Sequence, residues 1–140
     1  MTAKISYSDV EVGTELPAQT FPVTRDTLVR YAGASGDFNP IHWNERAARE
    51  AGLPDIIAHG MLTMARSVNG LVAWVGDPTA VVEYGVRFVR PVVVPDSGSD
   101  VVTVDAAIAE KLDGGRVRVA LTVVCGEDAV LGKAEAVVQL

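Results

Sequence analysis

Alternation of apolar and polar residues dominates the second half of the chain. A period of two predicts strands with one buried face and one solvent-facing face. The alternation, rich in valine, recurs over 82–88, 102–108, 117–125 and 130–139. Turn-forming sequences at 113–115 and 126–128 separate the last three of these strands. Because such connections are short, we expect the strands that they join to run antiparallel.

The first half of the chain carries helical patterns and polar loops instead. Residues 11–22 are expected to form a short leading strand or extended segment. Thr24 is a suitable N-cap for a helix over about 25–34, and Asn44 for a short helix over 45–50. A glycine-containing loop joins these two predicted helices.

A longer helix is predicted over about 60–74. Its apolar positions follow the i, i+3/i+4, i+7 spacing, at Met61, Met64, Ala65, Val68, Leu71, Val72 and Val75. Leu62 and Ala73 widen this stripe nearly all round, which is typical of a buried helix. The apolar face of the sheet must pack against another element, and this helix is the longest of the predicted helices. We therefore expect an α+β fold in which a twisted antiparallel sheet wraps around a central helix.

Length, composition and charge narrow the class of protein. The chain has 140 residues, 49% of them hydrophobic and 21% charged, which fits one globular domain spanning 1–140. A net charge of -6 argues against a nucleic-acid partner and against attraction to anionic membranes. No segment has the roughly 20 apolar residues that cross a bilayer, and the first residues show no signal core. We expect a cytoplasmic protein.

Cys125 is the only cysteine of the chain. It can form no intramolecular disulfide, and zinc sites built on several cysteines are excluded. Cys125 falls at an apolar-facing position of a predicted strand, so we interpret it as a buried structural thiol rather than a nucleophile.

A carboxylate and an imidazole lie five residues apart in the loop after the first predicted helix. Asn39 precedes Pro40, and proline restricts the residue before it to extended conformations, so Asp37 and His42 share a constrained backbone. Imidazole titrates near neutral pH, and a carboxylate can accept a proton from water, so such a pair suits acid–base catalysis. The alternative is that Asp37 only forms the turn and His42 only packs in the interior.

A second segment, 57–62, leads into the predicted central helix. Exposed N–H groups at a helix N-terminus favour negative charge, and Gly60 lets another molecule approach the backbone closely. An N–H there could stabilise an enolate oxygen. The alternative is that Gly60 only permits a tight turn. For His59 we favour a structural role, in which its ring satisfies local backbone groups.

The two segments together resemble the MaoC-like family of (R)-specific hydratases and dehydratases. The matching residues are 36–42 (Gly-Asp-Phe-Asn-Pro-Ile-His), with 31–33 before them and Ala47 after them, and 58–62 (Ala-His-Gly-Met-Leu). Residues 84–88 resemble the family's first strand after the central helix, so the resemblance covers essentially the whole chain. Within the family, the chain resembles the catalytic B subunits of heterodimeric mycobacterial (3R)-hydroxyacyl-ACP dehydratases.

The resemblance implies a hot-dog fold and a reaction. Family members interconvert (3R)-hydroxyacyl and trans-2-enoyl thioesters of coenzyme A (CoA) or acyl carrier protein (ACP) in fatty-acid metabolism. Asp37 and His42 would be the catalytic pair that holds and activates water. Asn39 would orient the loop or the substrate, and Gly60 would supply the oxyanion N–H. The resemblance implies no metal and no cofactor, and a homodimer or a heterodimer with another hot-dog subunit.

Three other functions fit the same fold. These are an acyl thioesterase, a non-catalytic acyl-binding subunit, and a small-molecule sensor. The Asp-x-Asn-Pro-x-His sequence of 37–42 favours the hydratase over the thioesterase. Non-catalytic subunits of the heterodimeric branch lack the Asp/His pair, whereas this chain has both residues, so we expect it to be an active member.

Overall fold

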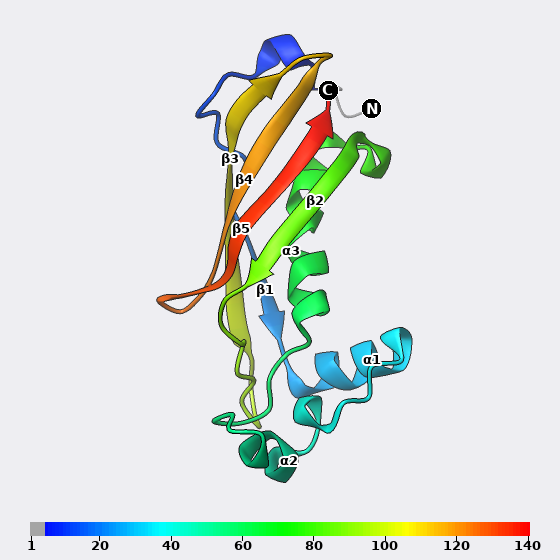
Figure 1. Cartoon of the computed structure of the whole chain (residues 1–140), viewed down its shortest axis with the longest axis vertical. Helices are drawn as coiled ribbons and strands as arrows, with labels where there is room; N and C mark the ends of the chain where they lie inside the picture. Colours follow the sequence, from blue (N-terminus) through cyan, green and yellow to red (C-terminus); the bar gives the residue numbers. More distant parts are fainter. Residues whose placement is uncertain (1–4) are drawn as a thin grey trace.

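The structure, a computed structural model, describes residues 5–140 of the chain. Figure 1 shows a single sheet with one long helix beside it and two shorter helices at one end. In chain order the elements are β1 (Gln19–Val23), α1 (Arg25–Ser35), α2 (Glu45–Glu50), α3 (Gly60–Val75), β2 (Val81–Phe88), β3 (Asp100–Leu112), β4 (Arg116–Cys125) and β5 (Asp128–Gln139). Short 3₁₀ turns lie at Tyr7–Asp9, Pro40–His42 and Pro78–Ala80.

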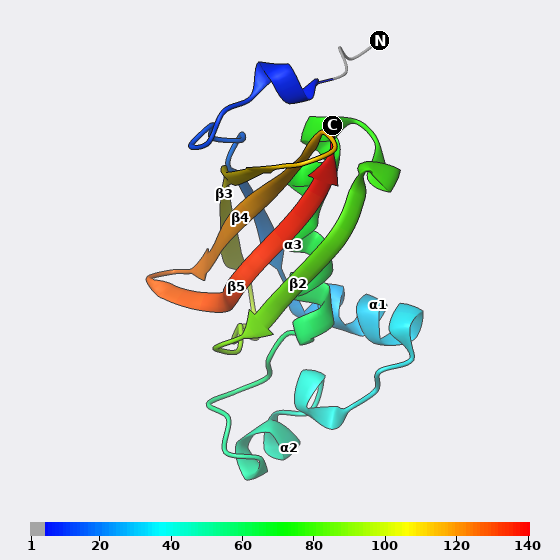
Figure 2. The same ribbon diagram turned by 45° about the horizontal axis from the view of Figure 1, so that its top comes forward.

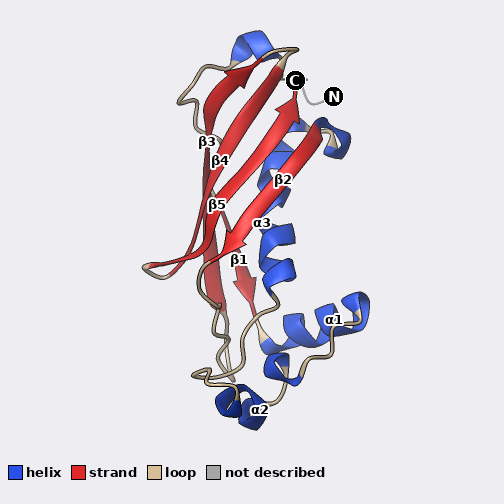
Figure 3. Ribbon diagram, in the orientation of Figure 1, coloured by secondary structure: helices blue, strands red, loops and turns tan. Residues whose placement is uncertain are grey.

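All five strands form one antiparallel sheet in the order β1-β3-β4-β5-β2, and α3 lies along one face of it (Figures 1 and 3). The four stretches of period-two alternation correspond to β2 through β5, so the predicted strands and their antiparallel pairing are confirmed. The predicted α+β architecture, a sheet against one long helix, is confirmed as well.

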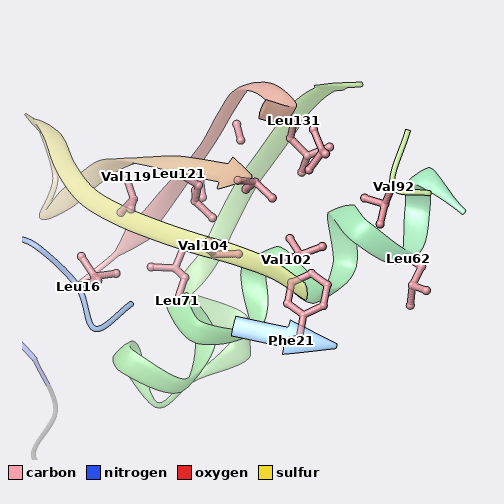
Figure 4. Packing of buried hydrophobic residues seen from close by; sticks show 14 of the residues in the cluster. Leu16, Phe21, Leu62, Leu71, Val92, Val102, Val104, Val119, Leu121 and Leu131 are labelled. Atoms are coloured by element: carbon pink, nitrogen blue, oxygen red, sulfur yellow. The ribbon is translucent and has the colours of Figure 1, made fainter. Parts of the chain in front are cut away.

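The alternation of the strands builds the core. Val102 and Val104 of β3 and Val119 of β4 are fully or almost fully buried, and Leu71 brings α3 onto them (Figure 4). Burying one such aliphatic side chain contributes about 1.5–3 kcal/mol. Tyr84 adds a polar link, because its hydroxyl donates a 2.7 Å hydrogen bond from β2 to the Met64 carbonyl of α3. Burial raises the pKa of Tyr84 to about 12, so the hydroxyl keeps its proton.

The expected leading strand is present as β1, at the end of the predicted segment 11–22. Of the expected segment 11–22, only the last residues join β1, and the residues before them touch β3 through an isolated bridge between Glu15 and Ala107. Pro17 lacks an N–H and cannot donate to a sheet ladder. Pro22 is nevertheless accepted inside β1 because β1 is an edge strand, where proline is tolerated.

Helix α3 is buried on one side only, so the prediction of burial nearly all round is wrong for this chain by itself. The buried residues are Leu62, Thr63, Ser67, Leu71 and Val75. Met61, by contrast, is 57% exposed. A single sheet can cover only one face of a helix, and the apolar residues of α3 exceed that face. Among the described residues, no helix is both long and apolar enough to cross a membrane.

Local signals fix the two ends of α1 and so place the loop that follows. The hydroxyl of Thr24 accepts from the N–H of Thr27, as the predicted N-cap requires. Gly36 ends the helix in the left-handed conformation, with φ of 76°, a value that glycine adopts without steric cost. The chain therefore turns sharply just before Asp37. Figure 2 shows α1 and α2 beyond the end of the sheet, with α1 close to the first turn of α3 and α2 farther away.

Candidate active site

The structure brings Asp37 and His42 together, as their spacing in the loop suggests. Oδ2 of Asp37 lies 3.9 Å from Nε2 of His42. The Asp37 side chain is 52% exposed, whereas the His42 side chain is only 7% exposed. The carboxylate is therefore accessible to solvent, whereas the imidazole ring beside it is buried.

The tautomer of His42 follows from its buried partner. Nδ1 of His42 lies 2.7 Å from the carbonyl oxygen of Ile57. A carbonyl can only accept, so Nδ1 carries the hydrogen and the neutral ring presents the lone pair of Nε2 towards Asp37. Two acceptors then face each other across 3.9 Å. One water molecule can span that gap and donate one hydrogen to each, which would raise the electron density on its oxygen.

Side chains and backbone amides hold the carbonyls of the loop 37–39 in place. The three contacts are Nε2 of His59 to the Asp37 oxygen at 3.1 Å, Nε1 of Trp43 to the Phe38 oxygen at 2.9 Å, and the His42 N–H to the Asn39 oxygen at 3.1 Å. Each successive carbonyl accepts one hydrogen bond. The backbone that carries the Asp37 carboxylate is therefore fixed before any ligand arrives.

Asn39 orients the loop from within. Its N–H donates to Oδ1 of Asp37 at 3.1 Å, which leaves Oδ2 of that carboxylate facing His42. Its side-chain oxygen accepts from the N–H of Ile41 at 3.3 Å and caps the 3₁₀ turn Pro40–His42. Both bonds are internal to the loop.

His59 packs against the pair more closely than its place in the sequence indicates. Its ring stacks on that of His42, with centroids 3.7 Å apart and planes inclined by 21°, and it meets Tyr31 edge-on at 4.8 Å. The residue is 1% exposed. The backbone group that it satisfies is the carbonyl of Asp37, which lies 22 positions away in the sequence. Among the described residues, its Nδ1 has no hydrogen-bond partner.

Burial lowers the pKa of His59, and the nearby His42 ring lowers it further, against the opposing effect of the bond to the Asp37 carbonyl. His59 is therefore neutral in the folded protein over a pH range in which an unfolded histidine is protonated. An unfolded histidine takes up its proton near pH 6.5. Above that pH the group does not affect stability, whereas below it the unfolded state gains a proton that the folded state refuses.

We expect the free energy of unfolding to fall as the pH drops from 6.5 towards the lowered pKa of His59. The loss can reach about 1.4 kcal/mol per pH unit for one proton. Urea denaturation at pH 7.5 and pH 5.5 measures it, with His59→Gln as the matched variant that lacks the titrating ring. The chain has only two histidines, and the carboxylates are common to both proteins. Equal pH dependence in the two proteins would contradict the expectation.

Gly60 begins α3 beside this cluster. Within residues 5–140, no acceptor is found for the N–H groups of Gly60 and Met61. These are free donors at the positive end of the helix dipole. The ring of Phe88 covers Gly60 so closely that an added Cβ would lie 3.0 Å from a ring carbon.

A mainly apolar cavity of about 260 Å³ opens next to Gly60. Its lining residues come from the entry to α3, the end of β2 and β5, and are Ile57, Ala58, Gly60, Thr63, Phe88, Val89, Arg90, Pro91, Val92, Val130 and Leu131. The carbonyl of Ile57 holds His42, and the N–H of Gly60 is a free donor. The cavity is therefore lined by Ile57, whose carbonyl contacts His42, and by Gly60 at the start of α3.

Three potential metal ligands meet here, but their geometry does not suit one ion. Ligand atoms of Asp37, His42 and His59 all lie within 4.8 Å of one another. A metal binds in the plane of an imidazole ring, and the two stacked rings have nearly parallel planes, so their lone pairs cannot converge. In addition, Nε2 of His59 already donates to a carbonyl.

The Cys125 thiol belongs to a different part of the fold. Burial, and secondarily Asp100 and Asp128, raise its pKa to about 12. A thiol with so high a pKa is a poor nucleophile near neutral pH. The interpretation of Cys125 as a structural residue agrees with this environment.

Comparisons with known proteins agree on one family. The chain matches the family model described as "MaoC like domain" over residues 9–124. It is 43% identical over 79 residues to the 3-hydroxyacyl-thioester dehydratase X of Mycobacterium tuberculosis, covering 56% of this chain and 27% of that protein. It is 31% identical over 128 residues to the 3-hydroxybutyryl-CoA dehydratase of Methylorubrum extorquens, covering 89% and 78%.

A solved structure extends the likeness to the fold. The R-hydratase PhaJ1 from Pseudomonas aeruginosa superposes with a TM-score of 0.82 at 30% identity, over 97% of this chain and 85% of that one. The predicted hot-dog fold is thereby confirmed. The chain spans about a quarter of the length of the mycobacterial relative but most of the length of the other two proteins.

Proposed function

This chain belongs to the family of proteins with a MaoC-like domain, and from that premise we propose that it interconverts (3R)-hydroxyacyl and trans-2-enoyl thioesters by adding or removing water. The observation that carries the proposal is the 3.9 Å gap between Asp37 and His42, on a loop whose carbonyls are all held. The names of the relatives support the reaction class, since they are dehydratases and a hydratase.

In the hydration direction, Asp37 and His42 hold the attacking water between them. The water oxygen bonds to the β-carbon of the enoyl group while one of its hydrogens passes to the pair. The electrons of the double bond move towards the thioester carbonyl, and the α-carbon then takes a proton from the pair. The sum is one water added across one double bond, and dehydration is the reverse. The base and acid roles belong to the pair as a whole rather than to one of its residues.

The N–H of Gly60 takes the oxyanion role. Negative charge develops on the thioester oxygen as the water attacks, and a free N–H at a helix N-terminus stabilises that charge. One such donor is typically worth about 3 kcal/mol. The neighbouring cavity, largely apolar and about 260 Å³, suits part of an acyl chain.

Carrier, partner and location are extensions of the same proposal. We propose an acyl-CoA or acyl-ACP as the substrate, and residues 1–140 as one hot-dog domain. The half-covered helix α3, with Met61 exposed, supports a homodimer or a heterodimer with another hot-dog subunit. The proposal includes no metal and no redox cofactor, because water addition requires neither. A cytoplasmic location stays a prediction.

The test is hydration of crotonyl-CoA and of a longer trans-2-enoyl-CoA by the purified chain, followed as loss of the conjugated enoyl absorbance. Free thiol is measured in parallel, because a thioesterase of the same fold would release CoA. We expect loss of absorbance without thiol release. Thiol release without hydration would replace the proposal by the thioesterase. Where the chain alone is inactive, the assay is repeated with co-expressed hot-dog subunits, and inactivity there as well would contradict the proposal.

A further inference from the structure

We propose that His59 is a positioning residue for this reaction, one that aligns Asp37 and His42 with the N-terminus of α3 by hydrogen-bonding the first and stacking on the second. The inference rests on the proposed function. The inference goes beyond the proposed function because it gives His59 a role without any contact between His59 and the substrate. The neutral, buried ring acts only through the two residues that flank the reacting water.

The hydrogen bond fixes the residue that most needs fixing. The Asp37 carboxylate is half exposed, so packing does not determine its direction. Its direction depends on the Asn39 N–H, which holds Oδ1, and on the Asp37 backbone, whose carbonyl accepts Nε2–H of His59 at 3.1 Å. Loss of that donor would remove the bond that holds the Asp37 carbonyl, and the carboxylate could then shift relative to Nε2 of His42.

The stack fixes the other member of the pair. The rings of His42 and His59 lie 3.7 Å apart and nearly parallel, and Tyr31 meets His59 edge-on at 4.8 Å. A flip of the His59 ring by half a turn would replace Nε2 by carbon and break the bond to Asp37. His42 in turn keeps Nδ1 on the Ile57 carbonyl, so Nε2 must face the carboxylate.

The position of His59 in the chain connects these contacts to the oxyanion donor. His59 is the residue before Gly60, the first residue of α3. The same residue therefore carries the ring that holds the loop and the backbone that leads into the free N–H of the helix. His59 therefore helps to set the positions of Asp37, His42 and the Gly60 N–H relative to one another.

His59 is not a proton relay. Its Nδ1 has no partner among the described residues, and its ring is 1% exposed, so a proton has no path away from it. The titratable groups that face it are Asp37 and His42 from the loop and Tyr31 from α1. The lowered pKa of His59 keeps it uncharged beside His42.

A double-mutant cycle with crotonyl-CoA as the substrate tests the proposal. We expect His59→Phe, which keeps a ring but removes the N–H, to lower kcat about 10-fold or more, because misplacement of reacting groups carries penalties of that size. KM should change by less than about threefold, because His59 does not touch the substrate. His59→Gln, which keeps an N–H donor, should recover part of kcat.

The cycle separates positioning from general destabilisation. In the Asp37→Asn background, His59→Phe should change kcat by less than about twofold, because the residue through which it acts is already disabled. Val75→Ala, a buried substitution at the far end of α3, is the control for lost stability. Equal losses of kcat in both backgrounds, or a comparable loss in Val75→Ala, would overturn the proposal.

A spectroscopic readout keeps the inference separate from the proposed activity. The chain has two histidines, so the ring nitrogen signals that remain in His59→Ala, which removes the stacked ring, belong to His42. We expect them to change from the single Nδ1–H tautomer to a mixture of tautomers. Unchanged His42 signals would overturn the positioning role even in an inactive protein. If the wild-type chain is inactive but the His42 signals change in the variant, only the proposed reaction would be overturned.

Discussion

Asp37→Asn should reduce the turnover of enoyl-CoA hydration at least about a hundredfold while the fold survives, because general acid–base catalysis typically contributes 10²–10⁴-fold. The amide has nearly the size of the carboxylate and can still accept from the N–H of Asn39 at Oδ1. It cannot take a proton from water. Its NH₂ group would also point a donor towards Nε2 of His42, where the bridging water belongs. Steady-state kinetics with crotonyl-CoA, together with a thermal melt, measure both parts of the expectation.

Asp113→Asn is a matched control for Asp37→Asn. Asp113 is an exposed residue in the turn between β3 and β4, and the same change of charge there should leave kcat unaltered. Turnover close to that of the wild type in Asp37→Asn would remove the carboxylate from the mechanism.

His42→Ala should reduce turnover by at least about a hundredfold as well. The substitution removes Nε2, which faces Asp37, and also the Nδ1–H bond to the Ile57 carbonyl. The stability of this variant should fall more than that of Asp37→Asn, because His42 is buried and stacks on His59. A thermal melt beside the kinetic assay separates the two effects, since a protein that is still folded at the assay temperature cannot lose turnover by unfolding.

The double variant shows whether the two residues act as a unit. Groups that share one proton-transfer step are strongly non-additive, so the double variant should lose little more than either single variant. Losses that multiply would mean that Asp37 and His42 act in separate steps. Activity of His42→Ala near that of the wild type would contradict the assignment of the imidazole.

The strands were the most predictable part of the fold. A period of two is a strong constraint because a shift by one residue would move valines such as Val102 and Val104 from the core to solvent. Helix ends were predictable where a cap was present, as at Thr24 and Asn44. The leading strand was predictable only as a short strand or extended segment within 11–22, because the pairing of an edge segment depends on its neighbour rather than on its own pattern.

The candidate site was predictable only in part. The motif pointed to Asp37 and His42 because both lie in one short loop, where sequence distance limits spatial distance. The contact between His59 and the Asp37 carbonyl joins segments 22 residues apart, and the Ile57 carbonyl that anchors His42 is a backbone atom without a sequence signature. Such contacts depend on how α1 and α3 meet. The sequence offered one hint, namely that the two histidines of the chain lie in the two motif segments 36–42 and 58–62.

The exposure of α3 shows the limit of pattern analysis for a single chain. Apolar residues on several sides of a helix predict burial but do not say what buries them. In this chain the sheet covers Leu71, while Met61 faces outward. The same pattern would arise in a larger protein whose second half covered α3.

The three held carbonyls of the loop 37–39 also bear on how such a site can change over evolutionary time. The entropy of ordering this loop is lost once, when the chain folds, rather than at every encounter with a substrate. Substitutions that weaken any of the three bonds would therefore affect every substrate alike. Substitutions in the cavity around Phe88 and Val92 would change the acyl group that fits and leave the proton chemistry intact. Substitutions in the cavity lining can therefore change the range of substrates while the reaction stays the same.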